Sequence, residues 1–441
     1  MALINYHMSI SKRFFQKTLS GNPLLLTMYA SIVCFCTYSC MYAFRKPFGA
    51  GVYKVGDIDY KVILVIAQGL GYMISKFSGI KIISEMKERG RGKFIIILLS
   101  IAALSLLLFA VTPYPYSAVF MFINGLPLGM VWGLVFGYIE GRKITEFIGA
   151  MMCVSFIFSS GFMKDVGSSL MKDYHVSEYW MPFATGMIFY VPMLIMVFLL
   201  EQIPPPSPED KAARLDRSPM TAGQRKDLIK KFLPGLIALI ITYTMLSTIR
   251  DLRDNFIANI WAENGMSGVK HIFSKTENII AAIIFVAVGL IIIVKDNFKA
   301  FLLNHIMIAF GFLMVGVSTL LFSSGSIDPF YWMLFAGLGL YLAYVPFNAL
   351  FFERLIAAFR ISANVGFLMY LSDSFGYLGS LSVLVYKQLG TSKLQWTGFM
   401  TNLMLIVSVV GLVGISLSFV YFYRKYTTIE AAPAQPGIEN L

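Results

Sequence analysis

Two arginines are the residues whose type and position best suit binding chemistry. Arg45 follows an unbroken apolar run from Leu24, and Arg250 follows a second run that starts near Phe232. A cation in hydrocarbon costs about 2.5 to 3.5 kcal/mol, so such a residue usually faces a cavity or a partner; the alternative is that its long side chain reaches the membrane surface. A guanidinium donates paired hydrogen bonds to phosphate or carboxylate oxygens, and the two arginines therefore predict an anion-binding site.

The two arginines occupy corresponding places in an internal repeat. A Thr-Tyr-Ser tripeptide from Thr37 precedes Arg45, and a Thr-Tyr-Thr tripeptide from Thr242 precedes Arg250 at the same offset. Residues 125–142 and 337–354 also match, since each segment begins Gly-Leu and ends with a glutamate and an arginine. Repeats of this kind are typical of membrane proteins built from two similar bundles. We expect the repeat to bring both arginines to one central cavity.

Two further cations are candidates for the same cavity. Arg253 lies three residues after Arg250 and shares its helix face, so it competes with Arg250 for the role. Its neighbours Asp251 and Asp254 favour instead a paired charge at the membrane surface. Lys76 lies within an apolar segment and is predicted either to add a third cation or to reach the cytoplasmic face.

Acids and tyrosines complete the set of candidates. Lys164 and Asp165 interrupt the fifth apolar segment, and we expect them to neutralise each other as a buried pair, with proton coupling as the alternative. Asp373 is the clearest buried acid of the second half and is predicted to carry a proton or to pair with a cavity cation. Tyr38 and Tyr42 are four residues apart, so their hydroxyls line one helix face; aromatic packing is the other explanation.

The sequence contains no pattern typical of an enzyme. No metal-ligand spacing, nucleotide-binding glycine loop or nucleophile with a histidine base is present, and the four histidines are scattered. We therefore expect no catalytic residue, no metal and no cofactor.

Hydropathy predicts the elements that position these residues. Hydrophobic residues make up 57% of the 441 and charged residues only 14%, against roughly 25% charged in a soluble domain. A membrane span needs about 20 apolar residues. The sequence predicts an all-α integral membrane protein with twelve such spans, near residues 24–44, 62–84, 94–112, 117–139, 147–170, 180–200, 232–249, 272–294, 301–322, 329–352, 361–385 and 397–423.

One composition break divides these spans six to six. Residues 202–231 are rich in proline and charge, which predicts a central loop between an N-terminal bundle, 1–201, and a C-terminal bundle, 232–426. The tail, 427–441, has no apolar periodicity and is expected to be disordered.

The net charge of +12 is explained by membrane topology rather than by a nucleic-acid partner. The basic residues lie in short connections on one side of the spans, so both termini and the central loop are predicted to be cytoplasmic. No cleaved signal peptide is evident, because the first apolar run ends in Arg45 and Lys46 without a small-residue cleavage site. We expect a monomeric, multi-pass protein of the plasma (inner) membrane.

Several short motifs resemble one transporter family. The pattern Tyr38-x-x-x-Tyr42-x-x-Arg45-Lys46-x-Phe48 is similar to the first-helix motif of the organophosphate:phosphate antiporters of the major facilitator superfamily. Segments 75–79, 344–346 and 375–379 resemble the family's second, tenth and eleventh helices. The resemblance implies two six-helix bundles and makes Arg45 and Arg250 the phosphate-binding pair. It also implies a cavity lined by Tyr38, Tyr42, Lys46, Lys76, Tyr344 and Tyr377.

Two departures from that family concern the substrate. The fifth helix has Ser155, Ser159 and Ser160 but no histidine, and Arg250 is followed by Asp251 where the family tends to be aromatic.

The resemblance implies exchange of an organophosphate for inorganic phosphate by alternating access. Two alternatives stay open. One is a transporter-like sensor of a phosphorylated metabolite, and the other is a proton-coupled carrier of a carboxylate or peptide that uses Asp373 or Asp165.

Overall fold

The computed structural model describes residues 15–56, 58–85, 90–140, 142, 144–208, 210, 222–361, 365–390 and 395–431. Within these residues, twelve helices are long and apolar enough to cross a membrane, which confirms the predicted fold class. The first half contains α2 (Pro23–Tyr42), α3 (Tyr60–Glu85), α4 (Arg91–Val111), α5 (Ser117–Phe136), α6 (Thr145–Lys172) and α7 (Met181–Leu200). The second half contains α9 (Ala222–Glu263), α10 (Ile272–Ile292), α11 (Asn297–Ser323), α12 (Pro329–Pro346), α14 (Val365–Gly390) and α15 (Trp396–Ala431).

Short elements connect some of these helices. A 3-10 turn, η1 (Pro47–Ala50), and a two-stranded antiparallel hairpin of β1 (Lys54–Val55) and β2 (Ile58–Asp59) join α2 to α3. A π turn, η2 (Phe347–Phe351), and α13 (Phe352–Ala358) continue α12. We call the end of the bundle that holds β1 and β2 the hairpin end.

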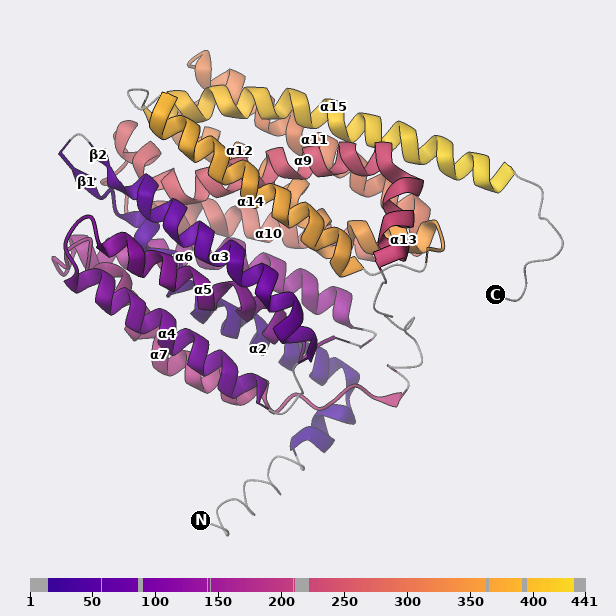
Figure 1. The fold of residues 1–441 in the computed structure, drawn as a ribbon, viewed down its shortest axis with the longest axis horizontal. Coiled ribbons are helices and arrows are strands. Elements are labelled where there is room, and N and C mark those ends of the chain that lie inside the picture. The colour runs from indigo at the N-terminus through magenta and orange to yellow at the C-terminus, as the bar shows by residue number, and fades with distance from the viewer. Residues whose placement is uncertain are drawn as a thin grey trace, which may run out of the picture.

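The two halves lie side by side and repeat one packing pattern (Figure 1). In the first half α2 packs on α6 and α7, α3 on α5, and α7 on α4; in the second half α9 packs on α14 and α15, α10 on α12, and α15 on α11. Each pair of the first half thus has a counterpart six spans later. Between the halves, α6 packs on α10 and α3 on α14, which are also equivalent pairs.

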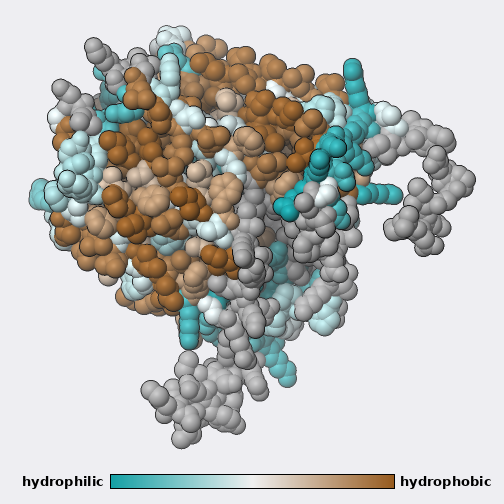
Figure 2. All heavy atoms as spheres, viewed as in Figure 1, coloured by the Kyte–Doolittle hydropathy of each residue, from teal (hydrophilic) through white to brown (hydrophobic). Residues whose placement is uncertain are grey.

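The outer surface is suited to lipid. Figure 2 shows hydrophobic side chains covering the middle of one face, with hydrophilic residues toward its edges. Large apolar side chains such as Leu24, Ile293 and Leu389 are 70%, 72% and 81% exposed. In water this exposure would be costly, whereas in hydrocarbon it is not, so the surface agrees with a membrane-spanning bundle.

Local sequence signals begin several helices. Asn22 accepts a hydrogen bond from the Leu25 N–H at 3.1 Å, and Pro23 occupies the first helical position of α2. Asp328 caps α12 in the same way, again before a proline. The Asn or Asp side chain accepts a hydrogen bond from a backbone N–H that has no partner within the helix. Proline has no N–H that would need a partner at the first helical position. Both helices therefore start at an Asn-Pro or Asp-Pro pair.

Helix α9 runs well past its predicted span. Hydropathy ends the seventh span at Ile249, but the helix continues to Glu263 and therefore carries Arg250, Arg253 and Asp254 within it. At its other end, α9 already begins at Ala222, inside the predicted central loop, and it is kinked at Phe232.

The C-terminal boundary also differs from the prediction. Helix α15 extends to Ala431, five residues into the predicted tail, and Tyr426 stacks on Phe298 of α11 with 3.6 Å between ring centroids. This contact stabilises the last turns of the helix. The rest of the predicted tail, 432–441, lies outside the described residues.

Small residues let α3 and α5 approach closely. A Cβ added to Gly71 would lie 2.1 Å from the Phe122 carbonyl oxygen, and one added to Gly125 would lie 2.2 Å from that of Gln68. Close backbone approach at glycine is typical of helix pairs in membranes, because packing rather than the hydrophobic effect holds them together.

Candidate functional site

Arg45 lies in the turn that follows α2, where its guanidinium stacks on a tyrosine of α3. The Arg45 Cζ is 3.9 Å from the centroid of the Tyr72 ring. The charge of Arg45 interacts with four tyrosines, and among the described residues no carboxylate forms an ion pair with it. Ring faces attract a cation but do not neutralise it, so Arg45 keeps its positive charge available to a ligand.

Arg250 holds the corresponding place in the second half. Its Cζ lies 4.1 Å from the centroid of the Tyr344 ring, so each arginine stacks on a tyrosine of its own half. Unlike Arg45, it forms an ion pair with its neighbour Asp251, with 2.5 Å between Nη2 and Oδ1. Its buried Nε has no hydrogen-bond partner within the described part of the chain. Arg250 therefore retains a donor for a ligand.

Tyrosines from both halves interact with both arginines. Tyr42 and Tyr72 each interact electrostatically with both Arg45 and Arg250. The Tyr38 and Tyr42 rings meet edge to face at 5.3 Å, and the Tyr72 and Tyr377 rings lie 5.5 Å apart across the interface between α3 and α14. We call this group, with the two arginines and Tyr344, the arginine–tyrosine cluster. It contains Tyr38, Tyr42, Tyr344 and Tyr377 of the sequence-predicted set.

Two tyrosines of this region are absent from the predicted site. Tyr72 lies one turn before Lys76 on α3, and Tyr243 is the repeat counterpart of Tyr38. Helical spacing would have indicated the first, and the repeat would have indicated the second.

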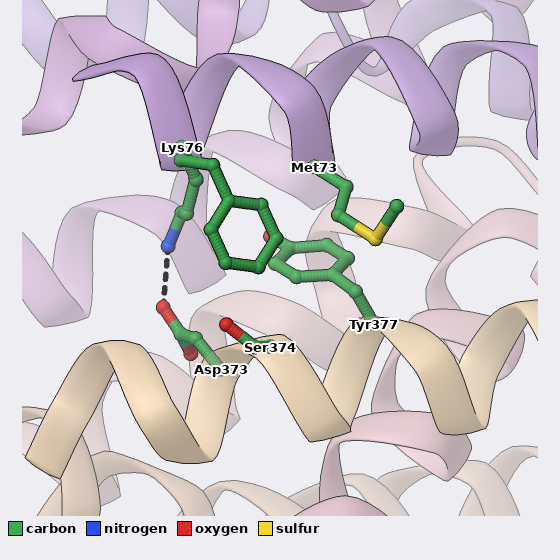
Figure 3. A pocket seen from close by; sticks show the side chains of 6 residues that line it. Met73, Lys76, Asp373, Ser374 and Tyr377 are labelled. Atoms are coloured by element: carbon green, nitrogen blue, oxygen red, sulfur yellow. Dashed lines mark hydrogen bonds and ion pairs between the residues drawn. The ribbon is translucent and has the colours of Figure 1, made fainter. Parts of the chain in front are cut away.

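Lys76 and Asp373 join the two halves beside the arginine–tyrosine cluster (Figure 3). The Lys76 Nζ lies 2.6 Å from Oδ2 of Asp373, and the Tyr243 hydroxyl donates to Oδ1 of the same carboxylate. Figure 3 shows Lys76 on α3 reaching down to Asp373 on α14, with Tyr377 one turn further along. The pair borders a cavity of about 10 Å³, which is room for one water. Among the candidates, Lys76 and Asp373 therefore pair with each other.

Lys46 and Lys164 share one carboxylate of the opposite half. Both lysines form ion pairs with Asp254 of α9, and the Ser160 hydroxyl donates to the same carboxylate. The lysines are 5% and 2% exposed, so this ion triad is buried between η1, α6 and α9. Lys46, which the resemblance assigns to the cavity lining, is engaged here by Asp254.

The predicted pairing of Lys164 with Asp165 is wrong. These neighbours project from different faces of α6, because consecutive helical residues are about 100° apart. Asp165 instead accepts hydrogen bonds from the backbone N–H groups of Phe273 at 3.3 Å and Ser274 at 2.7 Å, at the start of α10. A carboxylate is favourable at this position, where helix N–H groups are unpaired. The Asp165 side chain borders a second cavity, of about 610 Å³.

Arg253 is not at the membrane surface, which corrects the sequence-based interpretation. Its side chain is buried and pairs with Glu277 of α10, with 2.8 Å between Nη1 and Oε1. Its Nη2 also donates to the Met333 carbonyl of α12 at 3.1 Å. The expected partners were Asp251 and Asp254, but the extra turns of α9 carry Arg253 into the second half's interior. There it links three helices, whereas Arg250 faces the tyrosines.

Further polar contacts connect the halves toward the hairpin end. The Lys61 ammonium donates to the carbonyls of Gly49 and Gly51 at 2.9 and 2.7 Å and to Oδ1 of Asn259 at 2.8 Å. Closer to that end, the Trp396 indole donates to Asp59 of β2 at 2.8 Å. With the ion triad, these contacts hold the halves together on one side of the arginine–tyrosine cluster.

Family membership is decided by a match over most of the chain. Residues 47–425 match a family described as a family of unknown function (DUF5690). The chain belongs to this family. The matched region includes Arg250 and the other second-half residues of the site, and it begins two residues after Arg45. No curated protein matches this DUF5690 sequence.

Solved structures establish the fold of this DUF5690 member. A bacterial homologue of the human drug peptide transporters PepT1 and PepT2 aligns with a TM-score of 0.60 and 13% identity, over 91% of this chain and 99% of that one. A D-xylose–proton symporter aligns with a TM-score of 0.59 and 14% identity, over 90% and 97% of the two chains. The human organic anion transporter MFSD10 (TETRAN) aligns with a TM-score of 0.56 and 13% identity, over 89% of this chain and 99% of that one. The fold is therefore that of the major facilitator superfamily.

Proposed function

We propose that this DUF5690 protein is a secondary active transporter that exchanges a small organophosphate for inorganic phosphate. The observation that carries the proposal is the pair of tyrosine-stacked arginines, Arg45 and Arg250, one from each half. In the described part of the chain Arg45 has no carboxylate partner and the Arg250 Nε has no acceptor, so a tetrahedral oxyanion would satisfy both.

Alternating access gives exchange a physical reason. With no ligand, the two guanidinium groups leave a surplus positive charge in the site, because Asp251 offsets only one of them, and closing the site removes this charge from water. A bound anion neutralises this charge and lowers the barrier to reorientation. The loaded transporter therefore returns faster than the empty one, which is the behaviour of an exchanger.

The comparisons support a carrier of this general kind. The three solved structures are named as transporters of peptides, of D-xylose and of organic anions, and they share the fold at 13 to 14% identity. A monomeric carrier in the plasma (inner) membrane, with the bilayer and a small anion as its only partners, is the simplest form of the proposal.

Counterflow in proteoliposomes tests the proposal. Vesicles loaded with unlabelled phosphate should take up labelled phosphate far faster than unloaded vesicles, and added organophosphates should compete. Intact phosphate binding without any flux would favour the sensor, which signals through the central loop instead of moving its ligand. Absence of both binding and flux would reject an anion site.

A proton-coupled carrier is the second candidate, favoured by the Lys76–Asp373 pair. A membrane-embedded acid that is paired across the two halves can lose its partner when the halves move apart, and it can then take up a proton. Uptake that accelerates under an imposed pH gradient, with no counter-substrate inside the vesicles, would favour this mechanism over exchange.

A further inference from the structure

Asp251 is an acid at a place where an anion site would not be expected to hold one. Its Oδ1 pairs with Nη2 of Arg250 at 2.5 Å, and its Oδ2 accepts a hydrogen bond from the Ser380 hydroxyl of α14 at 3.1 Å. The Asp251 charge also interacts with Tyr377, which interacts in turn with Arg45. The carboxylate is therefore held toward the arginine–tyrosine cluster from two helices.

The charges around the cluster can be counted from these contacts. Arg45 contributes one positive charge, while Arg250 and Asp251 cancel, and Lys76 and Asp373 also cancel. The cluster therefore presents one net positive charge instead of two. A singly charged anion would leave it neutral, and a doubly charged anion would leave an uncompensated charge in a low-dielectric interior.

We propose that Asp251 sets the charge of the transported anion, so that the substrate binds with one net negative charge. The inference rests on the proposed anion carrier and names its substrate class. This class comprises phosphodiesters, singly protonated phosphomonoesters, and phosphomonoesters that also carry an ammonium group.

The ion triad contributes a further positive charge near the site, but a test that compares wild type with a variant lacking Asp251 is independent of it. The ion triad of Lys46, Lys164 and Asp254 carries one surplus positive charge, and it attracts any anion. This background is the same with and without Asp251. The change in relative affinity on removing Asp251 therefore isolates the contribution of its carboxylate.

Two phosphate esters of fixed charge provide the probes. At pH 8 methyl phosphate is almost wholly divalent, since the second pKa of a phosphate ester is about 6, whereas dimethyl phosphate is monovalent at every relevant pH. Dissociation constants would be measured by titration calorimetry on the purified full-length protein. Wild type should bind dimethyl phosphate at least as tightly as methyl phosphate.

Asp251→Asn should reverse this preference. Loss of one carboxylate close to the ligand should move the ratio of the two affinities roughly tenfold to a hundredfold toward methyl phosphate. Asp251→Glu keeps the charge and should keep the wild-type ratio.

Several outcomes would overturn the inference. An unchanged ratio in Asp251→Asn would do so while leaving the anion carrier intact. If Asp251→Asn cannot be purified, Asp251→Ser removes the same carboxylate, and an unchanged ratio in that variant likewise contradicts the proposal. If wild type binds neither ester nor inorganic phosphate, the proposed function itself fails.

Discussion

At the scale of single residues, the two arginines should be separable from the other buried cations by function. Charge-assisted hydrogen bonds contribute roughly 1.5 to 3 kcal/mol each, so Arg45→Ala or Arg250→Ala should weaken phosphate binding by about tenfold to several hundredfold or more. Arg45→Lys and Arg250→Lys keep the charge but lose the planar fork, so they should bind detectably and transport poorly. Phosphate binding and counterflow measure the two effects. Near-normal transport in both Lys variants would remove the arginine pair from the site.

Arg253 should behave differently, because its role is structural in this fold. Arg253→Ala leaves Glu277 unpaired in the interior, and breaking a buried pair typically costs about 3 to 5 kcal/mol. We expect a large drop in thermal stability in detergent. Adding Glu277→Gln should restore part of the loss, since the orphaned charge is removed. A stable Arg253→Ala protein that fails only in phosphate binding would place Arg253 in the site after all.

At the scale of helices, the approach of α3 to α5 depends on glycine. Gly125→Ala places a methyl group against the Gln68 backbone, so the helices must separate, at a cost of about 1 to 3 kcal/mol. Gly289 on α10 has open space around the added Cβ, and Gly289→Ala should be neutral or slightly stabilising. Thermal unfolding of the two variants provides the comparison, and equal effects would contradict the close packing.

Hydropathy predicts the spans well because hydrocarbon demands a continuous apolar stretch for every crossing. The same rule places the end of the seventh span too early. It treats Arg250 as an exit from the membrane, whereas ion pairs to Asp251 and Glu277 let α9 continue with its charges buried. A single sequence contains no signal that pairs Arg253 with Glu277, which lies on another helix.

Part of the candidate site was also predictable from hydropathy, because charged residues within an apolar segment are easily recognised. Arg45, Arg250 and Asp373 are conspicuous because each interrupts an apolar run. The partner of Lys46 is not predictable in this way, since Asp254 lies on a helix of the other half and only the packing of the halves brings them together.

At the scale of the whole molecule, Asp254 should control how tightly the hairpin end is closed. Asp254→Asn leaves two buried lysines without a counter-charge, which favours separation of the halves and hydration of both amines. Spin labels at the exposed positions Lys54 and Lys270 would report a longer and broader distance distribution. Asp173→Asn removes an exposed acid and should leave the distribution unchanged. The same distribution in both variants would show that the ion triad does not hold this end together.

The π turn between α12 and α13 has a consequence for how the two halves can move. A π turn holds one residue more than the α-helical turn it replaces, and one residue of an α-helix corresponds to a rotation of about 100°. If η2 rewound to α geometry, α13 would turn by roughly that angle while Tyr344, two residues before Pro346, kept its place beside Arg250. Since η2 also packs against α6 of the first half, the rotation would move the two halves relative to each other. Deletion of one residue from 347–351 would remove the π turn while leaving α13 in its present orientation, so this rotation could no longer occur.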